Sequence, residues 1–263
     1  MRVRALQLDV DMSQSFDARV KATADLVRTS AVRGGVRADL VVLPELWPNG
    51  GFTYDVWEPT AQPLDGPLVT EFADLAREIG AYLHLGSMVE RRPDGGLSNT
   101  SVLLGPDGTT LATYRKMHLF GFSEGEPRLM TAGDEIVVAD TAFGRVGLAT
   151  CYDLRFPEMF RRLTDAGASI VVVPAAWPAP RVGHWTVLAQ ARAIENQVVV
   201  IAVNTAGTQG GKTMGGHSLV VDARGAVLAE AGAGPDLLDV EVDVSDVGAW
   251  REQFPVLPDR RLP

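Results

Sequence analysis

The chain has 263 residues, a formal net charge of -9, and a composition that is 46% hydrophobic and 22% charged. This composition is that of an ordinary globular protein, and it excludes fibrous and intrinsically disordered classes. The acidic balance argues against a nucleic-acid partner or an anionic membrane surface, and no apolar run reaches the roughly 18 residues that a membrane span needs. The start of the chain is too polar for a signal peptide, so we expect a cytoplasmic protein.

Strand-length apolar runs alternate with helix-period segments along the chain. We expect strands at residues 3–9, 39–44, 81–89, 100–104, 147–151, 169–174, 198–204, 218–222 and 237–242, and helices at 16–32, 68–79, 157–166 and 183–196. Several strands are continuous Val, Ile and Leu runs, as in strands that are covered on both faces. Helices that alternate with buried strands predict a layered α/β domain.

Turn signals and the lack of a linker define the organisation further. The Pro-Asp-Gly turns at 92–96 and 105–108, with a similar turn at 222–225, predict antiparallel hairpins beside the parallel strands. No low-complexity tract divides the chain, so we expect a single domain over residues 1–263. The run at 39–44 is echoed at 169–174, and both end at a proline. This short echo leaves internal pseudo-symmetry an open question.

The only cysteine, Cys151, lies where an apolar strand stops and Pro157 opens a helix. One cysteine excludes an intrachain disulfide. The positive end of a helix favours thiolate over thiol, so this position predicts a nucleophile that iodoacetamide labels quickly at neutral pH. The alternative is an inert, buried structural cysteine.

Two further residues stand at strand ends. Glu45 follows a buried strand and lies among apolar and aromatic neighbours, a setting suited to a general base. Lys116 is one of only three lysines and follows a strand that starts near Thr110. A lysine there can stabilise an oxyanion beside a nucleophile. The alternatives are a solvated carboxylate and a solvated lysine.

Three ordered motifs resemble the nitrilase superfamily of carbon-nitrogen hydrolases: residues 43–46 (LPEL), 114–120 (YRKMHLF) and 151–158 (CYDLRFPE). The 71 residues from Glu45 to Lys116 and the 35 from Lys116 to Cys151 suit that family. Weaker similarities at 184–185, 191–197, 216–218 and 251–257 extend the resemblance over nearly the whole chain.

The resemblance implies a four-layer αββα sandwich of two mixed sheets, usually paired into homodimers, with the C-terminal extension at about 245–263 contributing to the dimer interface. It implies Glu45 as general base, Cys151 as nucleophile, and Lys116 with the backbone N–H of Tyr152 as the oxyanion site. The substrate would be a small amide, cleaved through a thioester to a carboxylate and ammonia. No metal or organic cofactor is expected.

The family also has a second glutamate beside the triad. The loop at 122–127 offers Glu124 and Glu126, and the spacing in amidase-type relatives favours Glu126. Glu124 remains the alternative.

The residues after the cysteine bear on the substrate. Tyr152 and Asp153 resemble amidase-type branches, including ω-amidases that act on 2-oxo acid amides. Arg155 can pair with a substrate carboxylate, as a similarly spaced arginine does in N-carbamoyl amino acid hydrolases, so that activity is an alternative. A structural ion pair between Arg155 and Glu158 is another. Substrate-binding candidates further along the chain are Trp177, His184 and Trp185.

Two rival interpretations stay open. The first is a Cys–His hydrolase with His118 or His184 as base, although the four histidines lie far apart and form no metal-type pair. The second is a catalytically silent member that serves as a binding module. The filled Glu, Lys and Cys positions argue against the second, and core or loop histidines that make one hydrogen bond each are the alternative to the first.

Overall fold

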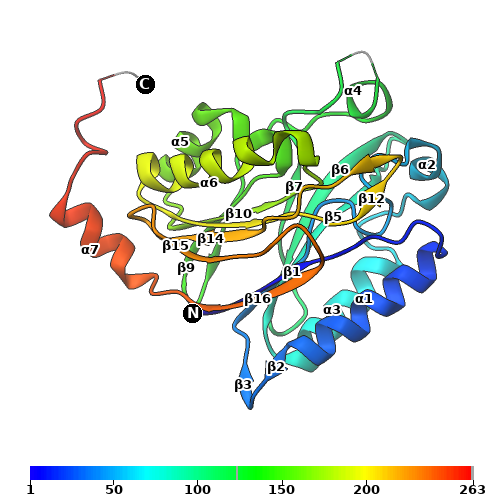
Figure 1. The fold of residues 1–263 in the computed structure, drawn as a ribbon, viewed down its shortest axis with the longest axis horizontal. Coiled ribbons are helices and arrows are strands. Elements are labelled where there is room, and N and C mark those ends of the chain that lie inside the picture. The colour runs from blue at the N-terminus through cyan, green and yellow to red at the C-terminus, as the bar shows by residue number, and fades with distance from the viewer. Residues whose placement is uncertain (123, 262–263) are drawn as a thin grey trace.

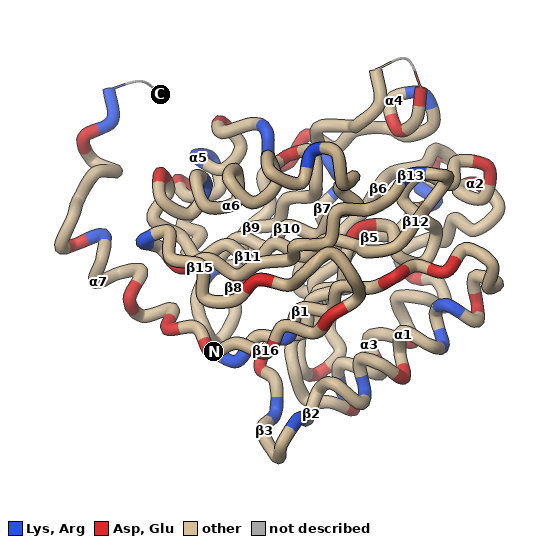
Figure 2. The backbone as a smooth tube through the Cα atoms, in the orientation of Figure 1, with Lys and Arg blue, Asp and Glu red and all other residues tan. Residues whose placement is uncertain are grey.

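The computed structural model describes residues 1–122 and 124–261. Two six-stranded mixed sheets lie face to face, and helices cover both outer faces (Figure 1). This is the predicted four-layer αββα sandwich. Charged residues gather mainly on outer elements such as α1, α7 and the β2–β3 hairpin (Figure 2).

The first sheet has the strand order β16-β1-β4-β5-β6-β7. Its three inner strands β1, β4 and β5 run parallel, whereas β16, β6 and β7 are antiparallel to their neighbours. Helices α1 (Phe16–Ser30) and α3 (Pro67–Ile79) make the crossovers and pack on the outer face. The strands are β1 (Arg2–Gln7), β4 (Leu40–Val42), β5 (Tyr82–Arg91), β6 (Leu97–Leu104), β7 (Thr110–Arg115) and β16 (Asp236–Glu241).

The second sheet has the order β15-β14-β11-β10-β9-β8, and its strands β9, β10 and β11 run parallel. Helices α5 (Pro157–Asp165) and α6 (Val182–Asn196) make its crossovers and cover its outer face. The strands are β8 (Val138–Thr141), β9 (Gly144–Leu148), β10 (Ile170–Pro174), β11 (Val199–Val203), β14 (Leu219–Val221) and β15 (Val227–Glu230).

Smaller elements connect and flank these layers. They are β2 (Val32–Arg33), β3 (Val36–Arg37), η1 (Tyr54–Val56), α2 (Trp57–Thr60), α4 (Glu126–Leu129), η2 (Cys151–Arg155), η3 (Ala179–Arg181), β12 (Thr208–Gln209), β13 (Lys212–Thr213) and α7 (Ser245–Gln253). None of the helices in the described part of the chain is long and apolar enough to cross a membrane.

Both faces of the central strands are covered, which explains the continuous apolar runs in the sequence. In β4, Leu40 and Val42 belong to the core between the two sheets, whereas Val41 and the following Leu43 pack with α1 and α3. Successive strand side chains point to opposite faces, so a strand with a helix on one side and a sheet on the other must be apolar throughout. The chain leaves this layer at Pro44, immediately before Glu45.

The two sheets repeat one topology. The series β1-α1-β4-α3-β5 matches β9-α5-β10-α6-β11, and in both halves an antiparallel strand flanks the first strand and two follow the third. The repeat places β4 and β10 at equivalent central positions. The short sequence echo at 39–44 and 169–174 therefore reflects a repeated βαβαβ framework.

The structure differs from the predicted elements in several places. The strand predicted at 147–151 is β9, which ends at Leu148, because Cys151 has φ 49° and opens η2 instead. Helix α7 and strands β8 and β15 were missed because most of their side chains face solvent and leave little apolar pattern. The glycine-rich stretch near 207–212, for which no element was predicted, belongs to the β12–β13 hairpin.

Candidate active site

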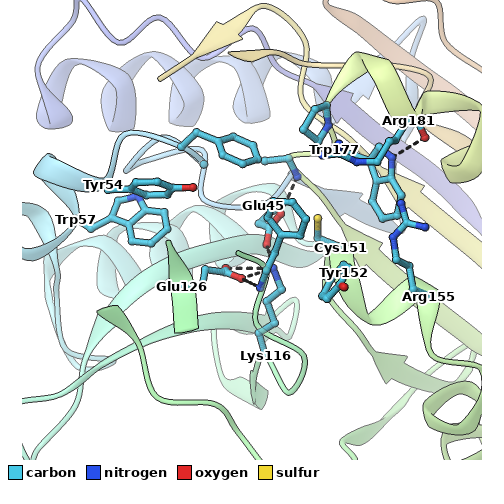
Figure 3. Close-up of a pocket in the computed structure, with 15 residues that line it drawn as sticks. Glu45, Tyr54, Trp57, Lys116, Glu126, Cys151, Tyr152, Arg155, Trp177 and Arg181 are labelled. Carbon is cyan, nitrogen blue, oxygen red and sulfur yellow. Dashed lines mark hydrogen bonds and ion pairs between the residues drawn. The ribbon is translucent and has the colours of Figure 1, made fainter. Parts of the chain in front are cut away.

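Four predicted residues from four chain segments meet in one cavity of about 420 Å³ (Figure 3). Glu45 follows β4, Lys116 follows β7, Glu126 begins α4 and Cys151 begins η2. All four side chains are buried, with exposed fractions from 1% for Lys116 to 7% for Cys151. The strand ends of both sheets therefore contribute to a single enclosed site.

The Lys116 ammonium lies between the two glutamates. Its Nζ is 2.7 Å from Glu45 Oε1 and 2.8 Å from Glu126 Oε2. Asn99, in the middle of β6, also joins them, because its Nδ2 donates to Glu45 Oε1 at 2.8 Å and to Glu126 Oε1 at 2.6 Å. Two carboxylates thus share two donors, which offsets the repulsion between them.

Backbone groups fix the orientation of both glutamates. The N–H of Ala176 donates to Glu45 Oε2 at 2.7 Å, and the N–H of Phe120 donates to Glu126 Oε2 at 2.6 Å. Ala176 follows β10, so the second half of the fold holds the glutamate that the first half supplies.

Burial and charge set the protonation of the lysine and of Glu126. Burial acts to lower the pKa of Lys116, but the charges of Glu126 and Glu45 outweigh it and raise that pKa well above its ordinary value. Lys116 is therefore a permanent ammonium at neutral pH. Burial raises the pKa of Glu126, the charge of Glu45 raises it further, and Lys116 opposes both.

The Cys151 thiol does not have the lowered pKa that the sequence predicted. Burial, followed by the charge of Glu45, raises the pKa of Cys151 well above its ordinary value, and Lys116 only partly opposes this. The prediction considered the positive end of a helix alone, whereas here a single 3-10 turn competes with full burial beside a carboxylate. Burial and Glu45 thus favour the neutral thiol in the resting enzyme, and the alkylation rate of Cys151 stays a prediction.

Asp153 connects the lysine and cysteine segments. Its buried carboxylate accepts hydrogen bonds from Tyr114 Oη at 2.7 Å and from the Thr150 N–H at 2.8 Å. Its Oδ1 lies 2.7 Å from His118 Nδ1, and the His118 ring stacks on Phe156 with centroids 3.7 Å apart. His118 is not among the residues that line the cavity. The structure thus offers the Cys–His interpretation no base from this residue.

The other predicted binding residues divide into two groups. Tyr152, Arg155 and Trp177 line the cavity. Trp185 lies behind Trp177, with ring centroids 5.6 Å apart, and is fully buried in the core. Its Nε1 donates a hydrogen bond to the backbone carbonyl of His217, so Trp185 is a core residue and does not line the cavity.

His184 and Glu124 lie away from the cavity wall. His184 is exposed, and its Nδ1 is 3.4 Å from both terminal nitrogens of Arg155. Glu124 is exposed on the loop before α4, in contrast to the buried Glu126. The alternative role of Arg155, a structural ion pair with Glu158, is not seen in the described part of the chain. The Arg155 guanidinium lies instead 4.6 Å from the ring centroid of Trp177.

Sequence reasoning missed several residues of the site. Asn99 carries a readable signal, because it belongs to a polar run, residues 98–101, inside an otherwise buried strand. Arg181, at the end of η3, gave no signal. Four further missed residues that line the cavity are aromatic: Phe52, Tyr54, Trp57 and Phe120. Among the residues that the structure describes, no group of three or more His, Cys, Asp or Glu side chains is arranged to hold a metal ion.

Comparison with known proteins assigns the family. Residues 2–252 match the carbon-nitrogen hydrolase family. The chain is 42% identical over 266 residues to the 2-oxoglutaramate amidase of Paenarthrobacter nicotinovorans, covering 98% of this chain and 89% of that protein. The chain therefore belongs to the carbon-nitrogen hydrolase family, and it is an enzyme of the amidase type.

Solved structures agree with this assignment. Nit3 of Saccharomyces cerevisiae, a member of branch 10 of the nitrilase superfamily, is 29% identical, with a TM-score of 0.88 that covers 100% of this chain and 97% of that one. A variant of the amidase from Nesterenkonia sp. AN1 is 26% identical, with a TM-score of 0.83 and coverage of 96% and 98%. In that structure acrylamide has added to the active-site cysteine.

Proposed function

We propose that this amidase hydrolyses the ω-amide of a 2-oxo dicarboxylic acid to the free acid and ammonia, through a thioester on Cys151. The observation that carries the proposal is the single cavity shared by Cys151, Glu45, Lys116 and Arg155. The cavity combines a nucleophile, a base, a permanent cation and a second cation that can bind a carboxylate.

The first half-reaction forms the thioester. Because the resting thiol is neutral, Glu45 removes its proton as Sγ attacks the amide carbonyl carbon. The carbonyl oxygen becomes an oxyanion held by Lys116 Nζ and the N–H of Tyr152. Collapse of this intermediate breaks the carbon–nitrogen bond, and the protonated Glu45 returns its proton to the leaving ammonia.

The second half-reaction releases the acid. Glu45 takes a proton from a water molecule, which attacks the thioester carbon, and the same oxyanion donors act again. The carbon–sulfur bond then breaks, and the proton on Glu45 restores the thiol. Glu126 acts as a positioning residue in both steps, because together with Glu45 it holds the Lys116 ammonium.

The substrate class rests on Arg155 and on the relatives. The Arg155 guanidinium lines the cavity without a carboxylate partner among the described residues, so it is available for a carboxylate at the end of the substrate remote from the amide. An ω-amide of a 2-oxo acid carries such a carboxylate, and the 42% identical relative is named for 2-oxoglutaramate.

We also propose a homodimer. Helix α6 exposes Val187 by 64% and Ile194, seven residues later on the same helix face, by 53%, and Phe254 of the C-terminal segment is 53% exposed. Apolar side chains on one surface are typical of a subunit interface. Val187→Glu should lower the mass measured by light scattering to that of a monomer; an unchanged mass would remove this face from the interface.

The test of the amidase proposal is an assay for released ammonia with three substrate sets: simple aliphatic amides, ω-amides of 2-oxo acids and N-carbamoyl compounds. We expect the highest kcat/KM with the second set, and no ammonia release by Cys151→Ala at an unchanged unfolding temperature. Retained turnover in Cys151→Ala would disprove the mechanism. A preference for N-carbamoyl compounds would support the alternative activity.

A further inference from the structure

Two arginines in the cavity lack an anionic partner among the residues that the structure describes. The third cation, Lys116, forms ion pairs with both Glu45 and Glu126. In contrast, neither Arg155 nor Arg181 forms an ion pair with a carboxylate of residues 1–122 or 124–261, although both line the same cavity as Cys151. A guanidinium cannot lose its charge in a protein, so each is a standing site for an anion.

Each of the two guanidinium groups lies over an aromatic ring. The Cζ atom of Arg155 lies 4.6 Å from the ring centroid of Trp177, and that of Arg181 lies 5.6 Å from the ring centroid of Phe120. Trp177 also donates from Nε1 to the backbone carbonyl of Arg181 at 2.8 Å, so it supports both arginines. Figure 3 shows Arg155 and Arg181 on either side of Trp177. Stacking restricts the rotamers of both side chains, which reduces the entropy lost when they bind an anion.

The charge balance of the cavity points the same way. Its lining contains three cations, Lys116, Arg155 and Arg181, and two carboxylates, Glu45 and Glu126, and the thiol is neutral. The empty cavity therefore has one positive charge in excess (3 - 2 = 1), in a chain whose net charge is -9. A substrate with one negative charge neutralises the cavity, whereas a neutral amide leaves the charge uncompensated.

We infer that Arg181 is a specificity-determining residue, which forms with Arg155 a two-arginine subsite for the 2-oxo carboxylate end of the substrate. This inference rests on the proposed ω-amidase reaction. A 2-oxo carboxylate presents three oxygens, and one guanidinium fork satisfies at most two of them. The second guanidinium provides donors for the third oxygen, so the pair distinguishes 2-oxo acids from neutral amides of the same length.

The kinetic test uses 2-oxoglutaramate, glutaramate and pentanamide, which differ at the end remote from the amide. Arg181→Ala should lower kcat/KM about 10- to 100-fold for 2-oxoglutaramate, because hydrogen bonds to a charged group are lost. It should lower kcat/KM less for glutaramate and leave pentanamide unchanged. Arg181→Lys should restore part of the loss with glutaramate. Arg128→Ala, which removes a charge from α4 outside the cavity lining, is the matched control and should have no effect.

A binding measurement separates this inference from the proposed reaction. In Cys151→Ala, calorimetry with 2-oxopentanoate, which has no amide, should detect binding that weakens about 10- to 100-fold on adding Arg181→Ala. If the wild type hydrolyses none of the amides but this binding is seen, the proposed reaction fails and the subsite stands. Equal losses for 2-oxoglutaramate and pentanamide, or 2-oxopentanoate binding that Arg181→Ala leaves unchanged, would overturn the subsite.

Discussion

The two halves of the sandwich share a framework but contribute different chemistry at equivalent points. After β4 the chain continues from Pro44 into Glu45, and after β10 it continues from Pro174 into two alanines. The first half thus places a carboxylate at the end of its central strand. At the equivalent strand end, the second half places the N–H of Ala176, which donates a hydrogen bond to this carboxylate. The nucleophile, in turn, comes from the end of β9 in the second half. The repeat supplies the positions, and single residues supply the functions.

The third strand of each half shows a second difference. Strand β11 pairs regularly from end to end, whereas the pairing of β5 shifts register between His84 and Ser87. Gly86 in this bulge has φ 69°, and a Cβ atom there would lie 1.9 Å from the Pro44 carbonyl oxygen. Ser87 Oγ accepts the N–H of Leu46 at 3.0 Å. The irregular strand therefore supports the loop that carries Glu45, and the regular strand has no such task.

The largest expected effect comes from removing the carboxylate that distinguishes the two halves. Glu45→Gln keeps the side-chain shape but cannot accept the thiol proton, so kcat should fall about 1000-fold or more. The measurement is ammonia release under substrate saturation. The amide oxygen can accept the N–H of Ala176, but the amide NH2 then faces the donors Lys116 and Asn99, so the unfolding temperature should also fall. A loss below about 10-fold would mean that another group is the base.

Two glycine substitutions, one in each half, compare how strongly the backbone is constrained at the two positions. Gly86→Ala in β5 meets backbone at a positive φ and should lower the free energy of unfolding by about 3 kcal/mol, with a matching loss of kcat. Gly183→Ala in α6 meets nothing within 4 Å and should raise it by about 0.5 kcal/mol. Urea unfolding measures both. Equal effects would show that the bulge in β5 carries no special constraint.

Asn99 of β6 donates hydrogen bonds to two side chains of the site. Among the residues that the structure describes, no side chain on a strand of the second sheet does the same. Asn99→Leu removes the donor shared by Glu45 and Glu126. We expect kcat to fall about 10- to 100-fold, because an anion pair loses hydrogen bonds worth about 1.5–3 kcal/mol. The acid limb of the pH profile should also move to higher pH, since the pKa of Glu126, already raised by burial, rises further. A stability loss with unchanged kcat and pH profile would reduce Asn99 to a packing residue.

The last prediction concerns His84 in β5 and affects stability alone. Burial lowers its pKa to about 3, so the folded protein holds the neutral ring. Because the unfolded pKa is about 6.5, the stabilisation is complete above that pH and is lost as the pH falls from 6.5 toward 3. Between about pH 7 and pH 5, the titration of His84 alone should lower the free energy of unfolding by about 2 kcal/mol. His84→Asn, which keeps an acceptor near the Gly86 N–H, should lose less stability over that interval in urea titrations; an equal loss would contradict the assignment.

Local patterns predicted a layered α/β domain and candidate residues at strand ends, and the family resemblance implied the four-layer sandwich. Glu45 and Cys151 each follow an apolar run, and Lys116 follows the mixed strand β7, so their convergence at strand ends follows once the layers are known. Of the two candidates for the second glutamate, the structure places Glu126 beside Lys116 and leaves Glu124 exposed, whereas the catalytic role of Glu126 stays a prediction. The protonation state of Cys151 could not be predicted in this way, because it depends on burial and on Glu45, which lies 106 positions earlier (151 - 45).

Binding residues were harder to predict for a related reason. A tryptophan has the same sequence signature in a core as in a pocket, so Trp177 and Trp185 could not be separated until their positions were known. Arg181 belongs to a short turn with no periodic pattern, and its importance appears only when Phe120, from the other sheet, is placed beside it. A sequence pattern within one half cannot predict which residues of the other half it contacts.

The interaction of Glu45 with Cys151 across the two halves is the central claim, and the pH dependence of Cys151 alkylation tests it most directly. Iodoacetamide should react slowly with the wild type at neutral pH and faster as the pH rises, because burial and Glu45 raise the pKa of the thiol. In Glu45→Gln the negative charge is gone while Lys116 remains, so the apparent pKa of alkylation should move to lower pH. An apparent pKa that stays the same or rises in Glu45→Gln would contradict the pairing of this base with this nucleophile.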